Sequence, residues 1–273
     1  MAYLEDLFTV KDKTALVTGG ATGIGRMVAT ALVQGGAHVY IASRKGADCE
    51  AVAEELNGLG APGRAEGFAG DVGSEEGVKA LAAELAQRTD RLNILVNNAG
   101  ISWGEPLETF PHAAWQKVMN VNVAGLFTLT RDLLPLLDKA ASDADPARVI
   151  NLGSVMGTVP LADGAYSYSA SKAAVHHLTR ILANEFAARR ITVNAFAPGP
   201  FQSKMTAFAT GTDEKADIVG RGVPLGRIGS PDDIAGATLY LCSKAGAYIS
   251  GAILPLDGGM SAHDSNRLFK DFQ

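Results

Sequence analysis

Thr18-Gly19-Gly20-Ala21-Thr22-Gly23-Ile24-Gly25 separates a short apolar run, 14–18, from a segment with helical spacing, 23–34. Backbone N–H groups at a helix start, with the positive end of the helix dipole behind them, attract a pyrophosphate. Gly19 permits a tight turn, Gly23 lets a phosphate approach, and Gly25 lets helix and strand pack closely. A glycine-rich turn by itself can be an ordinary strand–helix connection, but its place in the first β–α–β unit favours a dinucleotide site.

Short apolar runs alternate with helical patterns along the rest of the chain. Strands that are apolar on both faces belong to parallel sheets covered by helices, and strand–helix alternation produces right-handed crossovers. We therefore expect an α/β fold, a doubly wound Rossmann sheet of about seven parallel strands with helices on both faces, in which residues 1–273 form a single dinucleotide-binding catalytic domain. The expected strands are 14–18, 38–42, 64–68, 94–96, 148–152, 192–197 and 252–256, and the expected helices include 23–34, 74–88, 115–137 and 169–188.

One long segment, 200–224, is polar and irregular, with two short helical pieces at most. Long connections without secondary structure of their own are usually functional or mobile. We expect this segment to form a lid over the substrate.

The composition narrows the class of protein. The chain has 31 glycines among 273 residues, a formal net charge of −5 and only two cysteines, Cys49 and Cys242. No cluster of Lys and Arg indicates nucleic-acid binding, no apolar run reaches the ~18 residues of a membrane span, and Glu5 and Asp6 stand where a signal peptide would be basic. The cysteines match no metal spacing and fit free thiols, with a single disulfide as the alternative. We expect a cytoplasmic protein with no nucleic-acid, membrane or metal partner.

The end of the second expected strand bears on cofactor choice. An NAD site usually places Asp or Glu there, to accept a hydrogen bond from the ribose 2′-hydroxyl. This chain has Ser43-Arg44-Lys45 instead, which offers donors and positive charge to a 2′-phosphate. The pattern favours NADP(H), with NAD(H) as the alternative if Arg44 and Lys45 are solvated loop residues.

A candidate proton-transfer group follows from Tyr168 and Lys172, which stand four residues apart near the start of an expected helix. This spacing puts the phenol and the ammonium on one helical face. A free phenol, with a pKa near ~10, is a poor base at neutral pH, whereas a fixed cation nearby stabilises the phenolate. Ser154 follows the expected strand 148–152, at the sheet edge where ligands bind, and its hydroxyl can hydrogen-bond a substrate oxygen.

Taken together, these motifs resemble the short-chain dehydrogenase/reductase family of the classical type, over nearly the whole chain. The resemblance implies that Ser154 positions a carbonyl, that Tyr168 donates the proton, and that Lys172 lowers the pKa of the phenol and holds the nicotinamide ribose. It also implies that Asn122 anchors a water linking Lys172 to solvent, with Asn120 as the alternative. The motifs that carry the resemblance are 18–25, 97–100, Asn122, Ser154, Tyr168 with Lys172, and 198–199.

The resemblance further implies a set of cofactor contacts along the cleft. Thr22 stands where many NADP-dependent members carry Arg, Ser203 stands where a threonine commonly bonds the carboxamide, and Asn98 matches an asparagine that stabilises the fold. The implied cofactor-binding residues are Gly19, Thr22, Gly23, Ile24, Gly25, Ser43, Arg44, Lys45, Asp71, Val72, Asn98, Ala99, Gly100, Tyr168, Lys172, Pro198, Gly199, Phe201 and Ser203.

Within the family, 98–104, 132–137 and 198–206 are most similar to the branch of the 3-oxoacyl reductases and the rhamnolipid-pathway reductase, which implies NADPH and a β-keto substrate. Large apolar residues near a lid suit a hydrophobic substrate, although about half of such residues are expected to pack in the core. The expected substrate contacts are Ser154, Trp103, Met156, Tyr168 and Met205, with Val155, Leu161, Phe201 and Phe208 nearby.

We therefore expect an NADP(H)-dependent oxidoreductase that reduces a 3-oxoacyl or other bulky ketone. The alternatives are an alcohol dehydrogenase acting on a sugar, polyol or steroid and, more remotely, a dinucleotide-sensing regulator, which would not need Ser154, Tyr168 and Lys172. His176 and His177 lack a third ligand nearby and are expected in the core or at an interface rather than on a metal. The family's dimer-forming helices correspond to 115–137 and 169–188, and we expect a homotetramer.

Overall fold

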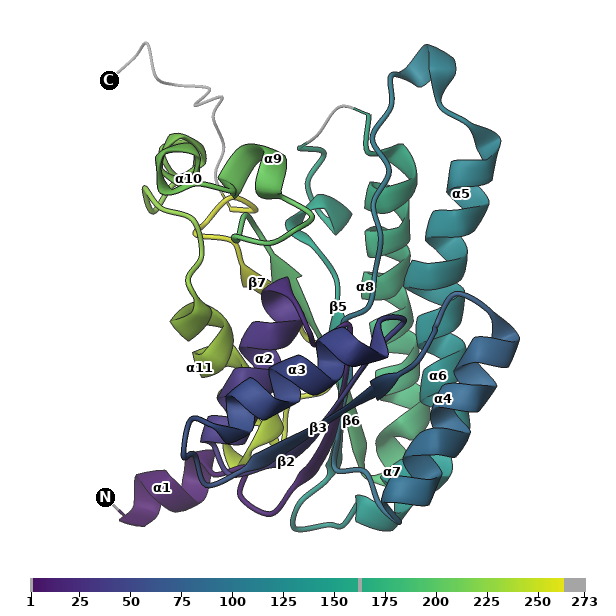
Figure 1. Cartoon of the computed structure of the whole chain (residues 1–273), viewed down its shortest axis with the longest axis vertical. Coiled ribbons are helices and arrows are strands. Elements are labelled where there is room, and N and C mark those ends of the chain that lie inside the picture. Colours follow the sequence, from purple (N-terminus) through teal and green to yellow (C-terminus); the bar gives the residue numbers. More distant parts are fainter. Residues whose placement is uncertain (1, 162–163, 263–273) are drawn as a thin grey trace.

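Seven parallel strands form one sheet in the structure, a computed structural model that describes residues 2–161 and 164–262 (Figure 1). The strand order is β3-β2-β1-β4-β5-β6-β7, so the winding reverses between β1 and β4. In an open α/β sheet this reversal leaves a crevice at the carboxyl ends of the strands. The strands are β1 (Thr14–Thr18), β2 (His38–Ser43), β3 (Arg64–Ala69), β4 (Ile94–Asn97), β5 (Ala147–Leu152), β6 (Ile191–Pro198) and β7 (Ile253–Leu256). Each lies within one residue of its predicted bounds, and the predicted fold class is confirmed.

Helices cover both faces of the sheet and enclose two apolar cores (Figure 1). The helices are α1 (Ala2–Phe8), α2 (Gly23–Gln34), α3 (Gly46–Asn57), α4 (Glu75–Arg88), α5 (His112–Met119), α6 (Leu126–Asp132), α7 (Leu134–Ala140), α8 (Tyr166–Phe186), α9 (Ala207–Thr210), α10 (Asp213–Gly220) and α11 (Pro231–Cys242). In β1, Val17 packs in the core under α2, α3 and α11, whereas Leu16 packs in the core under α4, α6, α7 and α8. The strands are therefore apolar on both faces because both faces are buried.

The predicted helix 115–137 is not continuous, and this part of the prediction was wrong. A π-helical turn over Asn120–Gly125 separates α5 from α6, and a second break precedes α7. At Gly125 the chain comes so close to the backbone after β3 that a Cβ would lie 2.0 Å from the carbonyl oxygen of Val72. Single π-helical turns are common at functional sites, and Asn122 lies in this one.

The segment 200–224 forms two short helices, α9 and α10, above the carboxyl ends of the strands (Figure 1). Its start is held at Phe201, which is buried and whose backbone pairs with Gly229 in an isolated parallel bridge. A Cβ at Gly229 would lie 2.1 Å from the Phe201 ring, so the ring fills the space of the missing side chain. The predicted irregular segment with two short helical pieces is confirmed, while its role as a lid stays a prediction.

A fully buried arginine ties the end of α11 to the sheet. Arg148 on β5 donates hydrogen bonds to the carbonyl oxygens of Leu241 at 3.2 Å and Ser243 at 2.8 Å, and to Asp145 at 3.0 Å. Carbonyl groups at a helix end lack partners within the helix, and a cation there is favourable. Burial lowers the pKa of Arg148, and these partners compensate for the loss of water.

Both cysteines are free and buried, Cys49 on α3 and Cys242 at the end of α11, as expected. Burial raises the pKa of the Cys242 thiol to about 12, which keeps it protonated and unreactive. Within residues 2–161 and 164–262, none of the helices combines the length and the apolar character that a membrane crossing requires.

The central strand β4 provides a test of the packing. Leu95 has no exposed surface, so we expect Leu95→Ala to lower the free energy of unfolding by about 2–5 kcal/mol, through lost burial and the cavity left behind. The matched control is Leu59→Ala, at a leucine that is 54% exposed, with a change within about 0.5 kcal/mol. Urea unfolding at one protein concentration measures both, and equal effects of the two substitutions would contradict this packing.

Candidate active site

The glycine-rich loop after β1 has the geometry of an anion cradle. Gly19 and Gly23 have φ angles of +66° and +53°, in the left-handed region that favours glycine. Thr22, the N-cap of α2, makes no side-chain hydrogen bond to the helix, so the N–H groups of the first turn remain available to an anion. Across the cavity, a Cβ on Gly23 would come within 3.0 Å of the Cβ of Ser203. The loop therefore fits the pyrophosphate of a dinucleotide.

Asn98, at the end of β4, holds this loop in place. Its side-chain amide donates to the carbonyl oxygens of Thr18 at 2.8 Å and Gly19 at 3.1 Å. A Cβ on Gly25 would lie 2.3 Å from the same amide nitrogen, so Gly25 permits this close packing. Asn98 thus couples the two strands at the point where the winding reverses.

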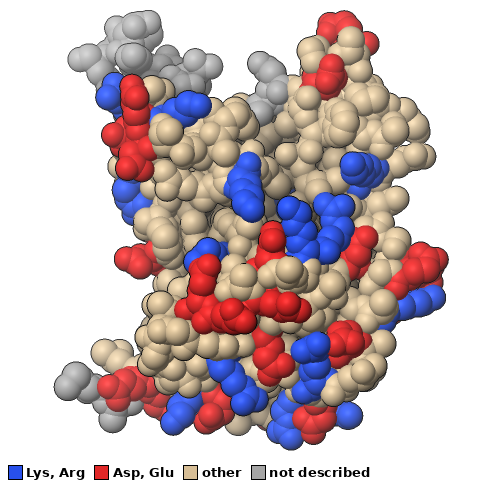
Figure 2. All heavy atoms as spheres, viewed as in Figure 1, with Lys and Arg blue, Asp and Glu red and all other residues tan. Residues whose placement is uncertain are grey.

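Residues expected to bind the adenosine half of the cofactor line a second cavity, a groove beside the glycine-rich loop. Ser43, Arg44, Asp71 and Val72 line it together with Gly19, Ala99 and Gly100. Figure 2 shows Lys and Arg side chains gathered near the middle of this face, above the acidic side chains of α3. Lys45 is not among the lining residues, and its exposed ammonium lies 4.0 Å from the Asp48 carboxylate on α3. The structure therefore leaves Arg44 as the cation that meets the groove at the end of β2.

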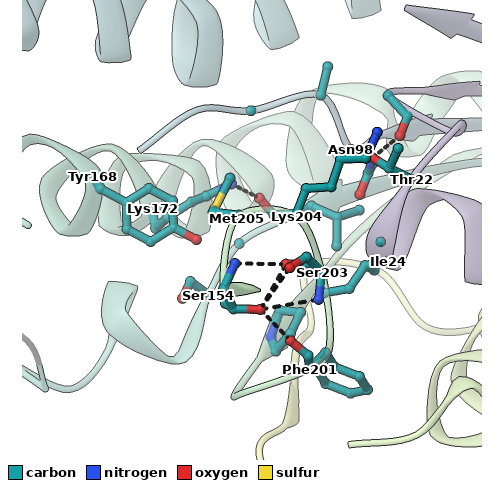
Figure 3. Close-up of a pocket in the computed structure, with 18 of the residues that line it drawn as sticks. Thr22, Ile24, Asn98, Ser154, Tyr168, Lys172, Phe201, Ser203, Lys204 and Met205 are labelled. Atoms are coloured by element: carbon teal, nitrogen blue, oxygen red, sulfur yellow. Dashed lines mark hydrogen bonds between the residues drawn. The ribbon is translucent and has the colours of Figure 1, made fainter. Parts of the chain in front are cut away.

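Tyr168 and Lys172 enter the cleft from the first turns of α8, while Thr22 and Ile24 face them from α2 (Figure 3). The Lys172 side chain is buried, with 5% of the residue exposed, and its ammonium lies 5.5 Å from the centroid of the Tyr168 ring. The ammonium donates a hydrogen bond to the carbonyl oxygen of Leu152, at the end of β5, at 2.6 Å. The predicted pair is therefore together on one helical face, with its cation directed into the cleft.

The pKa of Tyr168 is shifted in the opposite direction to the one expected from the sequence. Burial raises the pKa of Tyr168, and the nearby Ser154 hydroxyl opposes only part of that shift. Burial also lowers the pKa of Lys172 to about 8. In the chain without a bound dinucleotide, desolvation therefore outweighs the predicted lowering of the phenol pKa by the ammonium. The neutral phenol is the form that can donate a proton.

Ser154 lies two residues beyond the end of β5 and lines the same cavity as Tyr168 and Lys172. Its hydroxyl oxygen accepts a hydrogen bond from the Met156 amide at 3.2 Å, at the start of a one-turn 3-10 helix over Val155–Gly157. The cavity brings Ser154 and Tyr168 together with Met205, whereas Trp103 lines the neighbouring cofactor groove and Met156 does not line either cavity.

Asn122 is locked in the π-helical turn. Its side-chain oxygen accepts from the Ile101 amide at 2.9 Å, and its side-chain nitrogen donates to the Ile101 carbonyl and to the Ser171 hydroxyl, both at 2.9 Å. A Cβ on Gly100 would lie 3.3 Å from the Asn122 oxygen and 3.6 Å from the Lys172 nitrogen, so the two side chains flank one spot.

Sequence reasoning missed several residues of the site. Lys204 lines the cavity that holds Ser154, Tyr168 and Lys172, which we call the inner cavity (Figure 3). Its place directly after Ser203 could have indicated this. Lys117 comes from α5 and lines the cofactor groove without any local signal. The remaining predicted cofactor residues Pro198, Gly199, Phe201 and Ser203 line the inner cavity as expected. Within the described ranges 2–161 and 164–262, His, Cys, Asp and Glu side chains form no group of three that could hold a metal ion.

A phosphate-binding loop, a groove beside it and a Ser–Tyr–Lys group in one cleft together define a dinucleotide-dependent oxidoreductase. Comparison with known proteins supports this class of enzyme. The profile described as enoyl-(acyl carrier protein) reductase matches residues 19–261. The chain is 44% identical over 252 residues to the rhamnolipids biosynthesis 3-oxoacyl-(acyl-carrier-protein) reductase of Pseudomonas aeruginosa, covering 92% of this chain and 97% of that relative. The chain belongs to the short-chain dehydrogenase/reductase family and is an enzyme of the oxidoreductase class.

Other relatives act on different substrates. The 2-dehydro-3-deoxy-D-gluconate 5-dehydrogenase of Bacillus subtilis is 38% identical over 265 residues, covering 95% of this chain and 98% of that relative. Among solved structures, the Pseudomonas aeruginosa RhlG/NADP active-site complex is 42% identical with a TM-score of 0.89, covering 94% of this chain and 99% of the other. A gluconate 5-dehydrogenase from Burkholderia cenocepacia in complex with NADP and tartrate is 28% identical with a TM-score of 0.85, covering 96% and 100%.

Because the Lys172 ammonium is buried, we expect its removal to affect stability and activity in opposite directions. Lowering the pKa of Lys172 from 10.5 to about 8 corresponds to a desolvation cost of roughly 3 kcal/mol, which Lys172→Met removes. The Leu152 carbonyl loses its partner, at a cost of about 1–3 kcal/mol. We expect the melting temperature of Lys172→Met to equal or exceed that of the wild type, while turnover falls at least ~100-fold.

Calorimetry and the absorbance of the reduced nicotinamide measure the two effects. Lys79→Met, at an exposed lysine on α4, is the control and should change neither. A clear loss of stability in Lys172→Met, or wild-type turnover, would disprove the balance proposed for this buried charge.

Proposed function

We propose that this chain is an NADP(H)-dependent carbonyl reductase that acts on a 3-oxoacyl compound or another bulky ketone. The observation that carries the proposal is that Ser154, Tyr168 and Lys172 share one cavity with the glycine-rich loop. A carbonyl held in this cavity would lie near the hydroxyl groups of Ser154 and Tyr168 and near the loop that would hold a dinucleotide. We further propose that the whole chain acts as one catalytic domain, with 200–224 as the lid.

The reduction needs one hydride and one proton. A bound reduced nicotinamide supplies the hydride for the carbonyl carbon. The Tyr168 phenol is neutral at neutral pH, and burial raises its pKa further. It donates its proton to the carbonyl oxygen, and Ser154 holds that oxygen by a hydrogen bond as negative charge develops on it. The Lys172 ammonium stabilises the phenolate that remains, because an opposite charge nearby favours the ionised form.

The phenol must then regain its proton from solvent. Lys172 and Asn122 flank the spot beside Gly100, and Lys172 in turn lies against the Tyr168 ring. We assign to Asn122 the anchoring of a water at this spot, through which Lys172 exchanges protons. The lowered pKa of Lys172, about 8, suits an ammonium that gives up and regains a proton near neutral pH.

NADP(H) is the proposed cofactor rather than NAD(H). The end of β2 carries no acidic residue to accept from a ribose 2′-hydroxyl, and Arg44 lines the groove there. A guanidinium binds a phosphate with two parallel hydrogen bonds, which suits a 2′-phosphate. The RhlG structure and the Burkholderia cenocepacia structure are both complexes with NADP.

The apolar surroundings support a hydrophobic substrate. Met205 lines the catalytic cavity and Trp103 lines the groove beside it, and both side chains remain partly exposed. Leu161 and Phe208 are also exposed, but they line neither of the two. Apolar side chains that stay uncovered around a catalytic cavity suit a hydrophobic ligand. Oxidation of a sugar or polyol is the second candidate, since relatives named as a gluconate dehydrogenase and a galactitol 2-dehydrogenase are 38% and 40% identical.

The proposed assembly is a cytoplasmic homotetramer. Phe127 on α6 and Ile181 on α8 are 41% and 48% exposed, on the two helical regions expected to form a dimer. Exposed apolar side chains on neighbouring helices are typical of helix-to-helix interfaces between subunits.

The role of Tyr168 is tested by Tyr168→Phe, which removes only the hydroxyl. We expect turnover to fall by at least two orders of magnitude while the affinity for NADPH stays unchanged. Tyr240→Phe, at a tyrosine on α11 that is 39% exposed, is the matched control. Steady-state kinetics on a panel of ketones and alcohols, with NADPH binding followed by fluorescence, measures both quantities. Turnover of Tyr168→Phe near the wild-type rate would refute this assignment.

The cofactor preference is tested by Arg44→Ala. Loss of a charge-assisted hydrogen bond costs about 1.5–3 kcal/mol, so we expect the KM for NADPH to rise at least ~10-fold and that for NADH to change little. Arg91→Ala, which removes an exposed arginine between α4 and β4, serves as the control. An equal rise for both cofactors would show that Arg44 does not read the 2′-phosphate.

A further inference from the structure

His176 is a buried imidazole on α8, one helical turn after Lys172. Only 5% of the residue is exposed, and the ring lies under the loop that carries Ser154, away from the surface of the helix where His177 is exposed. His176 takes no part in the proposed transfer of hydride and proton.

Both ring nitrogens of His176 contact the Ser154 loop. Nε2 accepts a hydrogen bond from the backbone N–H of Ser154 at 3.4 Å, and Nδ1 lies 3.4 Å from the hydroxyl of Thr158. A backbone N–H can only donate, so Nε2 must carry the lone pair. The neutral ring therefore has its proton on Nδ1 and donates it to Thr158. One tautomer satisfies both ends of the loop.

The loop also wraps closely around the ring. A Cβ at Gly153 would lie 2.2 Å from Nε2, and a Cβ at Gly157 would lie 2.8 Å from Cε1 of His176. Gly153 precedes Ser154, which caps the 3-10 turn, and Gly157 is the last residue of that turn. Because the interior is close-packed, a shift of the ring moves the backbone on both sides of the serine.

The charge state of His176 agrees with this arrangement. Burial, followed by the positive charges of Arg180 and Lys172 on the same helix, lowers its pKa to about 4. Within the described residues, Ser154 and Thr158 face the ring from the loop, and neither carries a charge. The imidazole is therefore neutral at physiological pH and keeps the lone pair that the Ser154 amide requires.

We propose that His176 is a positioning residue for Ser154: by accepting the serine's backbone N–H in its Nδ1–H tautomer, it sets where the serine hydroxyl meets the carbonyl oxygen. The proposal rests on the proposed role of Ser154 in reduction. It differs from a general packing role because it depends on an acceptor atom at one end of the side chain, which variants of equal size can keep or remove.

Glutamine and methionine make the matched pair for this test. His176→Gln keeps an acceptor at the distance of Nε2, whereas His176→Met has nearly the same size and shape without a strong acceptor. We expect His176→Met to lower kcat at least ~10-fold with the KM for NADPH unchanged, and His176→Gln to stay within about threefold of wild type, since a lost backbone hydrogen bond has an effect of this size. His177→Gln on the exposed face is the control.

The possible results distinguish failure of the positioning role of His176 from failure of the proposed reductase function. Wild-type kcat in folded His176→Met, or an equal loss in the Gln and Met variants, overturns the positioning role while leaving the reductase function intact. No turnover by the wild-type enzyme on any ketone or alcohol overturns the proposed function instead.

A second measurement holds even if a variant fails to fold. In wild-type protein labelled with ¹⁵N-histidine, we expect the His176 signal to show a neutral ring protonated at Nδ1 from pH 8 down to about pH 5, because its pKa lies near 4. A ring protonated at Nε2, or one that becomes charged near its usual pKa of 6.5, overturns the proposal.

Discussion

The buried ammonium of Lys172 is the constraint on which the rest of this site depends. A charge removed from water is tolerated only where polar partners replace its hydration, and here the partner is the Leu152 carbonyl at the end of β5. This contact fixes the start of α8 against the carboxyl edge of the sheet. Tyr168, one turn earlier, is thereby held at the cleft beside Ser154. The cost of burying the charge, visible in a pKa near 8, is also what suits it to proton exchange.

Close approaches at three glycines bring the other elements of the site together. Gly25 lets the Asn98 amide reach the phosphate loop, Gly125 lets the π-helical turn approach the backbone at Val72, and Gly153 lets an imidazole lie under Ser154. At each position even one methyl group would overlap a neighbouring atom, so the spacing between elements is set at the level of the main chain. Such close packing transmits small displacements, and the geometry of the cleft is therefore sensitive to residues that never meet the substrate.

Buried amides hold the two functional helices to the sheet. Asn97 and Asn151 are paired in register on β4 and β5, and the Asn97 amide donates to Asn151 and to Thr130 on α6. The Asn151 amide donates to Thr179 on α8. Hydrogen bonds in a low-dielectric core are strong and directional, so they orient α6 and α8 as well as stabilise them. Asn122 and Lys172 are thus presented from a rigid frame rather than from loops.

Local rules were enough to predict the strands, the phosphate loop and the Tyr168–Lys172 pair from the chain alone, because runs of apolar residues, glycines with positive φ and a four-residue helical spacing act over a few residues. Local rules could not predict the break at Asn120–Gly125 or the raised pKa of Tyr168. Each of these depends on atoms distant in sequence or on the exclusion of water, which only the packed structure defines. The same holds for His176: its residue type was visible in the sequence, but its place beneath Ser154 was decided by the packing of α8 against β6 and against the 3-10 turn that follows β5.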